Sequence, residues 1–404
     1  MKLVLIIDDY LPDSTRVAAK MFHELAIELS KRGHSVTVIT PEFNDAGKIT
    51  VSELDGITIW RFKSGPIKDI GKFQRAINES VISFRAWKSI RHLVKSDSFD
   101  GVVYYSPSIF WGRLVNNIKS VCQCPAYLVL RDLFPQWVID AGMLRQGSIL
   151  ERYFRIFERY SYKQADGIGL MSEKNLEIFH EKNKGYPCEV LRNWADVSVC
   201  TNDQCEGGSI RERLNLHKKV IYFYGGNIGH AQDMANLMRL AKSMSHNENA
   251  HFLFVGQGDE VDLINSLALQ WDLKNFSYIP SVSQTEFKRI LAEVDIGLFS
   301  LSARHTAHNF PGKLLGYMVQ SLPILGSVNV GNDLMDVVNF NNAGYIHING
   351  EDDKLFASAQ KLYTDKALRE SLGENSRKLL HNQFSVASAA YAIEMRLEAE
   401  NAVN

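Results

Sequence analysis

The chain has 404 residues, of which 45% are hydrophobic and 23% are charged. This length exceeds one core of ordinary size and predicts two or three domains. The net charge of −1 argues against nucleic acid as a partner, because proteins that follow a phosphate backbone usually carry a clear basic excess. Five cysteines without a CxxC pair or a zinc-like spacing indicate reduced thiols in a cytosolic compartment.

In the first half of the chain, apolar runs typical of buried strands alternate with amphipathic, helix-like segments. A helix is expected over about 16–32, where apolar residues recur every four positions before Gly33. Strands are expected at 3–7, 35–40, 101–105 and 126–130, with a last strand within 185–195. No apolar run approaches the ~20 residues that a membrane-spanning helix needs, so any membrane attachment is expected to be peripheral.

Two loops of this half carry polar side chains after a predicted strand. In DDYLPDSTRVAAK (8–20), Asp13, Ser14 and Thr15 are natural helix caps. The same loop is also expected to line a cleft and to bind an acceptor through Asp9, Ser14, Thr15 and Arg16, with Arg16 able to meet a phosphate. In LRDLFPQW (130–137), Arg131 and Asp132 are candidates for acceptor binding and for proton acceptance, although a carboxylate here could simply cap a turn.

The segment 61–95 is strongly basic. It holds nine Lys and Arg against two Asp and Glu, a local charge of 9 − 2 = +7, with Phe62, Phe73, Phe84 and Trp87 between them. This pattern predicts docking on an anionic membrane surface, while an amphipathic helix with a solvated basic face is the alternative.

The second half begins after a polar, Gly-containing segment, 198–212, which is the candidate linker. A strand at 220–224 and a helix after it restart the alternating pattern. Further strands are expected at HFLFV, FSYIPSV, DIGLFSL and PILGSV, and helices over 354–400 with a break near Phe384 and Ser385. The pattern predicts an α/β chain with two Rossmann-like domains of similar size that face each other across a cleft.

Two glycine loops follow strands of this second domain. GGNIG (225–229) and GQGDE (256–260), the latter with Gly256, are expected at the carboxyl ends of neighbouring parallel strands, where open α/β sheets bind ligands. Neither loop is a Walker A motif or a complete dinucleotide-binding fingerprint. We therefore expect a nucleotide diphosphate, and the lack of an Asp-x-Asp triplet indicates that no metal holds it.

A third candidate anion site lies in HNFPGKLLGYM (308–318). Pro311 suits the first turn of a helix, Gly312 permits a close approach to the backbone, and Lys313 adds a positive charge beside the positive helix end. A solvated first-turn lysine is the alternative. His305 and His308 have no further metal ligands nearby, so either one could instead bond to a diphosphate or a sugar hydroxyl.

These segments together resemble the family 4 retaining glycosyltransferases of the GT-B fold. The likeness rests on SKRGHSVTVIT, RDLFPQW, GGNIG followed by Gln232, FVGQGDE and PGKLLGYMVQSLPI, which occur in the family's order along nearly the whole chain. Within the family, the chain is most similar to the WbuB-like branch of bacterial N-acetyl-L-fucosaminyltransferases. The resemblance implies an acceptor domain over 1–197 with 385–404 packed back on it, a nucleotide-sugar domain over 198–384, and a metal-independent donor site.

The resemblance also implies roles for particular residues. Gly226, Asn227 and Gly229 correspond to the family's diphosphate loop, Gly312 and Lys313 to its phosphate contacts at a helix start, and Ser281 and Val282 to the nucleobase position. Asp132 corresponds to an acidic position of this branch. The sequence departs from the family's Glu-x7-Glu pattern, because His308 and Gly316 stand at the two positions, and Gly316 replaces the Glu that holds the donor ribose.

We therefore expect a retaining enzyme that moves a sugar, most specifically N-acetyl-L-fucosamine from its UDP form, onto a polyprenyl-pyrophosphate-linked saccharide of O-antigen type. It would work on the inner face of the cytoplasmic membrane and would need no cofactor. Two alternatives stay open. One is a partner subunit of GT-B shape that binds nucleotide sugar without catalysis, and the other is a nucleotide-sugar 2-epimerase of the same fold.

Overall fold

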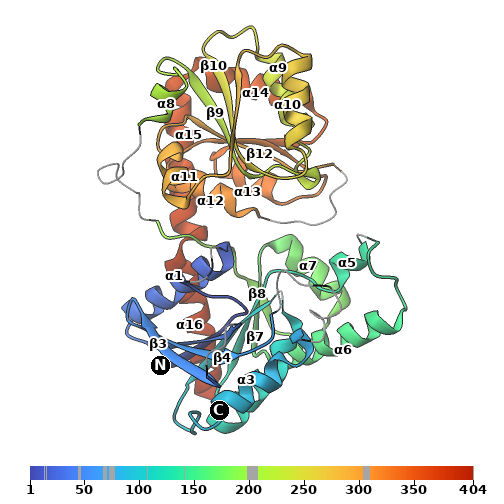
Figure 1. The fold of residues 1–404 in the computed structure, drawn as a ribbon, viewed down its shortest axis with the longest axis vertical. Coiled ribbons are helices and arrows are strands. Elements are labelled where there is room, and N and C mark those ends of the chain that lie inside the picture. The colour runs from blue at the N-terminus through green and yellow to red at the C-terminus, as the bar shows by residue number, and fades with distance from the viewer. Residues whose placement is uncertain are drawn as a thin grey trace. The chain divides into compact units, whose positions relative to one another are not determined.

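The structure is a computed structural model that describes residues 1–403 without 13, 15, 44–46, 67–70, 72–77, 107, 141, 198–207 and 304–309. The side chains of 137, 140 and 403 also lie outside the description. The chain divides into two compact units (Figure 1), one formed by Met1–Trp194 with Val386–Asn404 and the other by Ala195–Ser385. The boundaries expected from the sequence, at 197/198 and 384/385, lie within three residues of this division.

The first unit is built on an eight-stranded sheet with the order β3-β4-β2-β1-β5-β6-β7-β8. All neighbouring strands are parallel except the β3–β4 pair. The strands are β1 (Lys2–Ile6), β2 (Ser35–Glu42), β3 (Ile49–Leu54), β4 (Ile57–Lys63), β5 (Gly101–Ser106), β6 (Ala126–Leu130), β7 (Gly167–Leu170) and β8 (Cys188–Val190).

Helices cover both faces of this sheet. The helices of the unit are α1 (Val17–Lys31), α3 (Ile82–Ile90), α4 (Gly112–Cys122), α5 (Gln136–Asp140), α6 (Ile149–Gln164), α7 (Glu173–Lys182) and α16 (Val386–Val403). Strand β1 shows why two layers form, because its side chains alternate between two cores. Val4 and Ile6 pack with α3 and α4 on one face, whereas Leu3 and Leu5 pack with α1 and α16 on the other.

The last helix, α16, is fastened to the end of α1 and to the turn that follows it. Arg32 Nε donates to Glu394 Oε2 at 2.8 Å, and His34 Nε2 lies 2.9 Å from Glu394 Oε1. Apolar side chains of α16, including Ile393 and Leu397, are fully buried against the same face. The C-terminal helix therefore completes the core of the first unit, although the chain reaches it only after the second unit.

The second unit has a six-stranded parallel sheet with the order β11-β10-β9-β12-β13-β14. Its strands are β9 (Val220–Asn227), β10 (Ala250–Gln257), β11 (Phe276–Pro280), β12 (Ile296–Ser300), β13 (Ile324–Val328) and β14 (Gly344–Ile348). Its helices are α8 (Ile210–Arg213), α9 (Met234–Ser243), α10 (Val261–Gln270), α11 (Gln284–Leu291), α12 (Gly312–Val319), α13 (Leu334–Phe340), α14 (Asp352–Thr364) and α15 (Lys366–Leu379).

Two apolar clusters lie on the opposite faces of this second sheet. One joins the sheet to α11, α12 and α13, and the other joins it to α9, α10 and α14. The sheet continues in both directions from β9, since β10 and β11 follow on one side and β12 begins the other. The strand order therefore changes direction between β9 and β12, which is the position where open α/β sheets form ligand crevices.

The α/β fold with two Rossmann-like units is confirmed, and the predicted helix break before α16 is confirmed at a five-residue π-helical turn, Leu380–Phe384. One element was missed and two local predictions were wrong. The β3–β4 hairpin was not expected, although Asp55-Gly56 between two apolar runs is a strong turn signal. Strand β9 does not end at Tyr224 but continues to Asn227. Helix α1 has Arg16 at its N-cap and no side-chain cap; Ser14 instead accepts the Arg16 N–H.

The attachment of α16 gives a pH-dependent prediction. Burial alone would raise the pKa of Glu394, but hydrogen bonds from Arg32 and His34 outweigh it and hold that pKa below the ordinary value. Glu394→Gln should therefore lower the free energy of unfolding at neutral pH by about 1–2 kcal/mol. The difference should disappear as the pH falls through the lowered pKa, because the glutamate is then protonated in the wild type as well.

Urea unfolding across acidic and neutral pH measures this difference. Glu398→Gln is the matched control, because Glu398 is exposed on the same helix. A gap between Glu394→Gln and wild type that persists unchanged in acid would refute the assignment.

Candidate functional site

Near the point where the second sheet changes direction, the end of β9 lies beside the first turn of α12. Strand β9 pairs with β10 up to its last residues, with Gly226 opposite Gly256 and Asn227 opposite Gln257. A Cβ added at Gly226 would lie 3.8 Å from Lys313 Nζ. The structure thus brings together Gly226, Gly256 and Lys313, three residues that the sequence placed in separate candidate loops.

Glycine is required at the end of β10 by a close approach of two backbones. A Cβ on Gly256 would lie 1.8 Å from the carbonyl oxygen of Gly226, and a Cβ on Gly258 would lie 2.1 Å from that of Ile228. Neither backbone carbonyl can move aside cheaply. The glycines of GQGDE therefore have a structural role, because they hold the 225–229 segment in place. Contact of Gly256 with the donor stays a prediction.

Lys313 is the most unusual charged side chain at this position. Its Nζ atom is shielded from solvent and has no hydrogen-bond acceptor among the residues that the structure describes. The ammonium lies 3.7 Å from the centroid of the Tyr224 ring, within the range of a cation–π contact. Tyr224 was not recognised from the sequence as part of the site, although it directly precedes the glycine pair on the strand.

Burial lowers the pKa of Lys313 to about 7. The cause is desolvation, because a charged amine loses its hydration and gains no carboxylate in exchange. An aromatic face replaces only part of that hydration. A bound anion beside Gly226 would supply the missing partner, so the arrangement favours an anion such as a phosphate at this point.

The two helix starts near this point differ in what caps them. At the start of α12, Pro311 is the N-cap residue, Gly312 is the first helical residue, and no hydrogen bond from a described side chain caps the first turn. In contrast, Glu260 reaches the start of α9, where its carboxylate accepts from the Met234 N–H at 3.0 Å and lies 2.8 Å from His230 Nδ1. The protein's own carboxylate therefore occupies the α9 position.

This arrangement corrects the prediction that amides after GGNIG face a phosphate at a helix N-terminus. A short 3-10 helix, His230–Gln232, separates the loop from α9, and the Glu260 carboxylate caps the start of α9. The sequence contained this residue within GQGDE, but nothing in the spacing indicated that it would fold back onto the neighbouring helix.

The remaining predicted donor residues lie around the ends of β9, β10 and β11. Asn227 Nδ2 donates to Gln232 Oε1 at 2.9 Å, and Ser281 Oγ donates to Gln257 Oε1 at 3.0 Å. Gly229 is packed so that a Cβ would lie 2.6 Å from Asp259 Oδ1. Val282 is half-buried against the core, and His308 lies outside the described residues. Their contacts with a donor stay predictions.

Gly316 and Tyr317 lie on α12 beside the site. A Cβ on Gly316 would lie 3.3 Å from Leu291 Cδ1 of α11, the flexible end of a side chain, so a larger residue would require only a small shift there. The Tyr317 hydroxyl accepts from the Gly225 N–H at 3.2 Å and donates to the Leu298 carbonyl at 3.1 Å. Tyr317 therefore ties β9 to β12 at the site, while Gly316 offers no group to a ribose.

In the first unit, the predicted acceptor residues of the loop after β1 bond mainly to one another. Ser14 Oγ donates to Asp9 Oδ2 at 2.6 Å, and Arg16 Nε lies 3.6 Å from the same oxygen. Arg16 remains half exposed, with Asp9 beside it. Thr15 lies outside the described residues. The loop thus presents a paired cation rather than a free one.

Arg131 and Asp132 follow β6 and separate in the structure. The Arg131 guanidinium is buried, donates to the carbonyls of Gly169 and Arg192, and lies 5.4 Å from the Trp194 ring centroid. This placement makes Arg131 a structural residue and removes the support for its predicted acceptor contact. Asp132 is exposed, yet loss of surrounding water raises the pKa of its carboxyl, and Arg131 opposes that effect.

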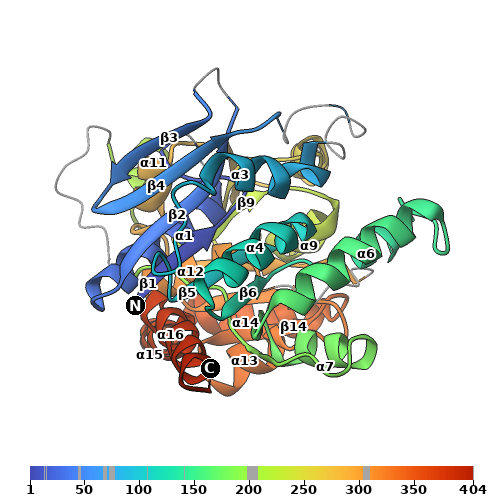
Figure 2. The same cartoon turned by 90° about the horizontal axis from the view of Figure 1, so that it is seen from below.

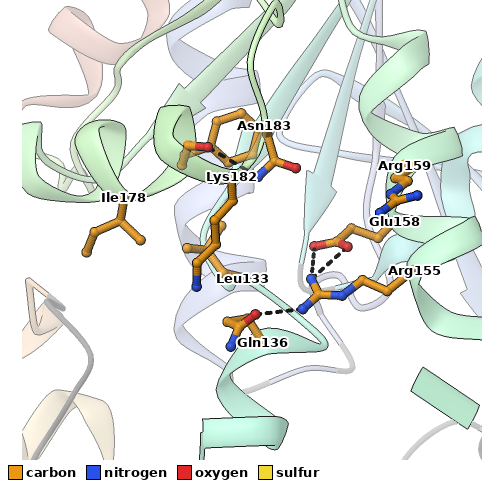
Figure 3. A pocket seen from close by; sticks show the side chains of 9 residues that line it. Leu133, Gln136, Arg155, Glu158, Arg159, Ile178, Lys182 and Asn183 are labelled. Carbon is orange, nitrogen blue, oxygen red and sulfur yellow. Dashed lines mark hydrogen bonds and ion pairs between the residues drawn. The ribbon is translucent and has the colours of Figure 1, made fainter. Parts of the chain in front are cut away.

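A cavity of about 200 Å³ lies beside the loop that begins with Asp132. Leu133 and Gln136 of the loop region line it together with residues of α6 and α7, as Figure 3 shows. Arg155 binds the buried Glu158 carboxylate at 3.0 Å and Gln136 Oε1 at 2.6 Å. Arg159 and Lys182 also line the cavity and form no ion pair with a described residue. The cavity is therefore positively charged.

The predicted membrane segment 61–95 is only partly described, because 67–70 and 72–77, with Lys72, Phe73 and Arg75, lie outside the described residues. Phe62 is fully buried and Trp87 packs against the core. The expectation that these two aromatic residues anchor the protein to a membrane surface was therefore wrong. Phe84 is exposed. Within the described part of the chain, no helix is long and apolar enough to cross a bilayer.

Comparisons with known proteins agree with this architecture. Residues 206–379 match the family model "Glycosyl transferases group 1". The chain is 26% identical over 222 residues to the probable glycosyltransferase WbjE of Pseudomonas aeruginosa, a match that spans 54% of each chain, or about half of that relative's length. It is 23% identical over 316 residues to the putative colanic acid biosynthesis glycosyl transferase WcaI of Escherichia coli K12, with 74% of this chain and 76% of WcaI covered.

Among solved structures, the Anabaena protein HepE in complex with UDP and glucose superposes with a TM-score of 0.67 at 13% identity. The superposition covers 99% of this chain and 100% of HepE. The chain therefore has the GT-B fold, and the match to the group 1 glycosyl transferase model lies within its second unit.

Because the Lys313 amine has no acceptor among the described residues, we expect it to lower the free energy of unfolding of the ligand-free protein. Lys313→Met should raise the free energy of unfolding at pH 7 by at least about 1 kcal/mol, because it removes a buried polar group without an acceptor. The folded pKa of about 7 lies below that of an unfolded lysine, so the free energy of unfolding of the wild type increases as the pH rises from about 7. The difference in stability between Lys313→Met and the wild type should therefore become smaller at higher pH.

Urea unfolding between pH 6 and pH 9, about the range in which this lysine titrates, tests the prediction. Lys242→Met is the matched control, because Lys242 lies over the Trp271 ring on the exposed side of α9. Equal stability changes for the two variants would show that Lys313 is an ordinary solvated lysine.

Proposed function

We propose that the protein is a retaining, metal-independent glycosyltransferase that takes its sugar from a UDP-linked donor. The acceptor is a polyprenyl-pyrophosphate-linked saccharide in O-antigen or related surface polysaccharide synthesis. In its most specific form, the proposal names N-acetyl-L-fucosamine as the sugar. The match to group 1 glycosyl transferases and the names of WbjE and WcaI support the reaction class and the polysaccharide context.

The observation that carries the proposal is the buried ammonium of Lys313 beside Gly226. It lies near the crevice position of the second sheet, within the segment that matches the glycosyl transferase model. The diphosphate of a nucleotide sugar has the charge and the size to reach both Lys313 and the first turn of α12. The similarity to HepE, whose structure contains UDP, supports a uridine nucleotide.

In this proposal, Lys313 and the α12 amides act on the leaving phosphate. Negative charge accumulates on the UDP oxygen as the bond from the sugar to that oxygen breaks. A preorganised ammonium in a site with little water stabilises this charge more strongly than one in bulk solvent. A bound anion also raises the pKa of Lys313, which burial lowers. The lysine would therefore be charged when the donor is bound.

On the acceptor side, Asp132 is the proposed group that orients or deprotonates the attacking hydroxyl. Its exposure makes the carboxylate accessible to an acceptor, and its raised pKa makes it a stronger base than an ordinary aspartate. The departing phosphate is the alternative proton acceptor in a retaining reaction. The loop with Asp9, Ser14 and Arg16 is the proposed contact for the rest of the acceptor.

One observation favours a second candidate function. Gly316 stands where the family carries a ribose-binding Glu and packs against α11, which supports a protein that binds nucleotide sugar without transferring it. Slow hydrolysis of a radiolabelled UDP-sugar by the purified protein would favour the enzyme. Tight UDP binding with no hydrolysis and no transfer would favour the binding subunit, and release of an epimerised sugar would favour an epimerase.

The role of Lys313 predicts a loss of donor affinity. Lys313→Met should weaken UDP binding by at least roughly tenfold, because a charge-assisted hydrogen bond to the phosphate is lost. Isothermal titration calorimetry with UDP and with GDP measures the effect and the base preference together. Lys242→Met should bind UDP like the wild type, and undiminished binding by Lys313→Met would remove Lys313 from the donor site.

The metal-independent mechanism predicts that EDTA leaves the transfer rate unchanged. The reason is that the positive charge that balances the diphosphate comes from Lys313 and from the helix start rather than from a divalent ion. Transfer assays with dialysed protein test this directly. A loss of activity in EDTA that Mn²⁺ or Mg²⁺ restores would contradict it.

A further inference from the structure

Helix α6 exposes a row of large apolar side chains on its outer face. Ile149 is 88% exposed and Ile156 is 66% exposed, and Tyr153 and Tyr160 are exposed between and after them. These four residues are spaced by three or four positions, so they form one stripe along the helix. Figure 2 shows that α6 extends outward from the first unit. A stripe of this kind is unusual for a surface that faces only water.

The positive charges of α6 lie along one edge of the same stripe. Arg152, Arg159 and Lys163 are exposed and form no ion pair with a described residue. The two acidic residues of the helix lie on its inner side, where Glu151 and Glu158 bind Arg155. The outer face of α6 is therefore apolar in its centre, basic along one edge and free of carboxylates.

The surface continues on both sides of the helix. On one side, a groove of about 670 Å³ between α3, α4 and α6 has the exposed Phe84 and Tyr160 in its lining, with Arg113 stacked 5.8 Å from the Phe84 ring centroid. On the other side, the cavity described above adds Lys182 to the positive charge of Arg159 (Figure 3). Aromatic and basic groups thus flank the α6 stripe without an exposed acid on the helix.

We propose that the outer face of α6 docks on the surface of an anionic lipid bilayer. Apolar and tyrosine side chains enter the boundary between headgroups and acyl chains, while Arg152, Arg159 and Lys163 meet lipid phosphates from the edge of the stripe. Charge complementarity decides the occupant. A second copy of this face would bring the same cations against one another, which opposes self-association.

This surface deepens the proposed function, because an acceptor linked to a polyprenyl chain must be reached at a bilayer. It also moves the membrane contact from 61–95 to α6, since Phe62 and Trp87 of the earlier candidate lie in or against the core. Vesicle binding requires neither donor nor acceptor. Failure of the docking proposal is therefore distinguishable from failure of the glycosyltransferase proposal.

The test is co-sedimentation of the full-length protein with vesicles of phosphatidylcholine, alone or mixed with phosphatidylglycerol. Wild type should bind the mixed vesicles. Ile149→Glu with Ile156→Glu should lower this affinity by at least roughly tenfold, because two inserted side chains become charged. Replacing Arg152, Arg159 and Lys163 by Gln should lower it about fivefold per residue on anionic vesicles only.

The matched control is Leu269→Glu, which places the same charge at an exposed leucine of α10 in the second unit. It should bind vesicles like the wild type. Circular dichroism and urea unfolding of every variant verify that the protein is folded. Three results would overturn the proposal: wild type that stays in the supernatant with anionic vesicles, α6 variants that bind like the control, or a concentration-dependent dimer that the isoleucine variants disrupt without any vesicle binding.

Discussion

The candidate site of the second unit depends on one buried charge, the ammonium of Lys313, which has no hydrogen-bond acceptor among the described residues. A buried amine without an acceptor is unfavourable, and the Tyr224 ring compensates only part of the lost hydration. The surrounding structure must therefore hold the lysine in place. Strand β9 supplies Tyr224 and Gly226, helix α12 supplies the lysine itself, and the Tyr317 hydroxyl links β9 to β12 beneath them.

The neighbouring contacts explain why an anion would bind here and not one loop further along. Glu260 already satisfies the start of α9, so that helix has its own negative partner. Among the residues that the structure describes, helix α12 has no such carboxylate at its first turn. Close backbone contact between Gly226 and Gly256 then fixes the end of β9 against β10. The ammonium of Lys313, in the first turn of α12, thus lies beside Gly226 at the end of β9 and has no acceptor among the described residues.

Much of this architecture could be predicted from the sequence, because strand and helix patterns reflect burial that is local in the chain. The alternating pattern predicts two α/β units, and Pro311-Gly312-Lys313 predicts the helix start. The sequence does not reveal contacts between distant segments. Glu260 folding back onto α9, Tyr224 beneath Lys313, and Arg131 turning inward to carbonyls all depend on tertiary packing. The glycines of GQGDE were recognised, but the backbone contact that requires them could not be read from the sequence.

The protonation of Lys313 with and without UDP tests the proposed donor site most directly. NMR of lysine side chains in the wild-type protein, with the Lys313 signal assigned by its absence in Lys313→Met, gives this pKa. The account predicts a pKa of about 7 in the free protein and a clear rise when UDP binds. A pKa at the ordinary lysine value in the free protein, or one that UDP leaves unchanged, would contradict it.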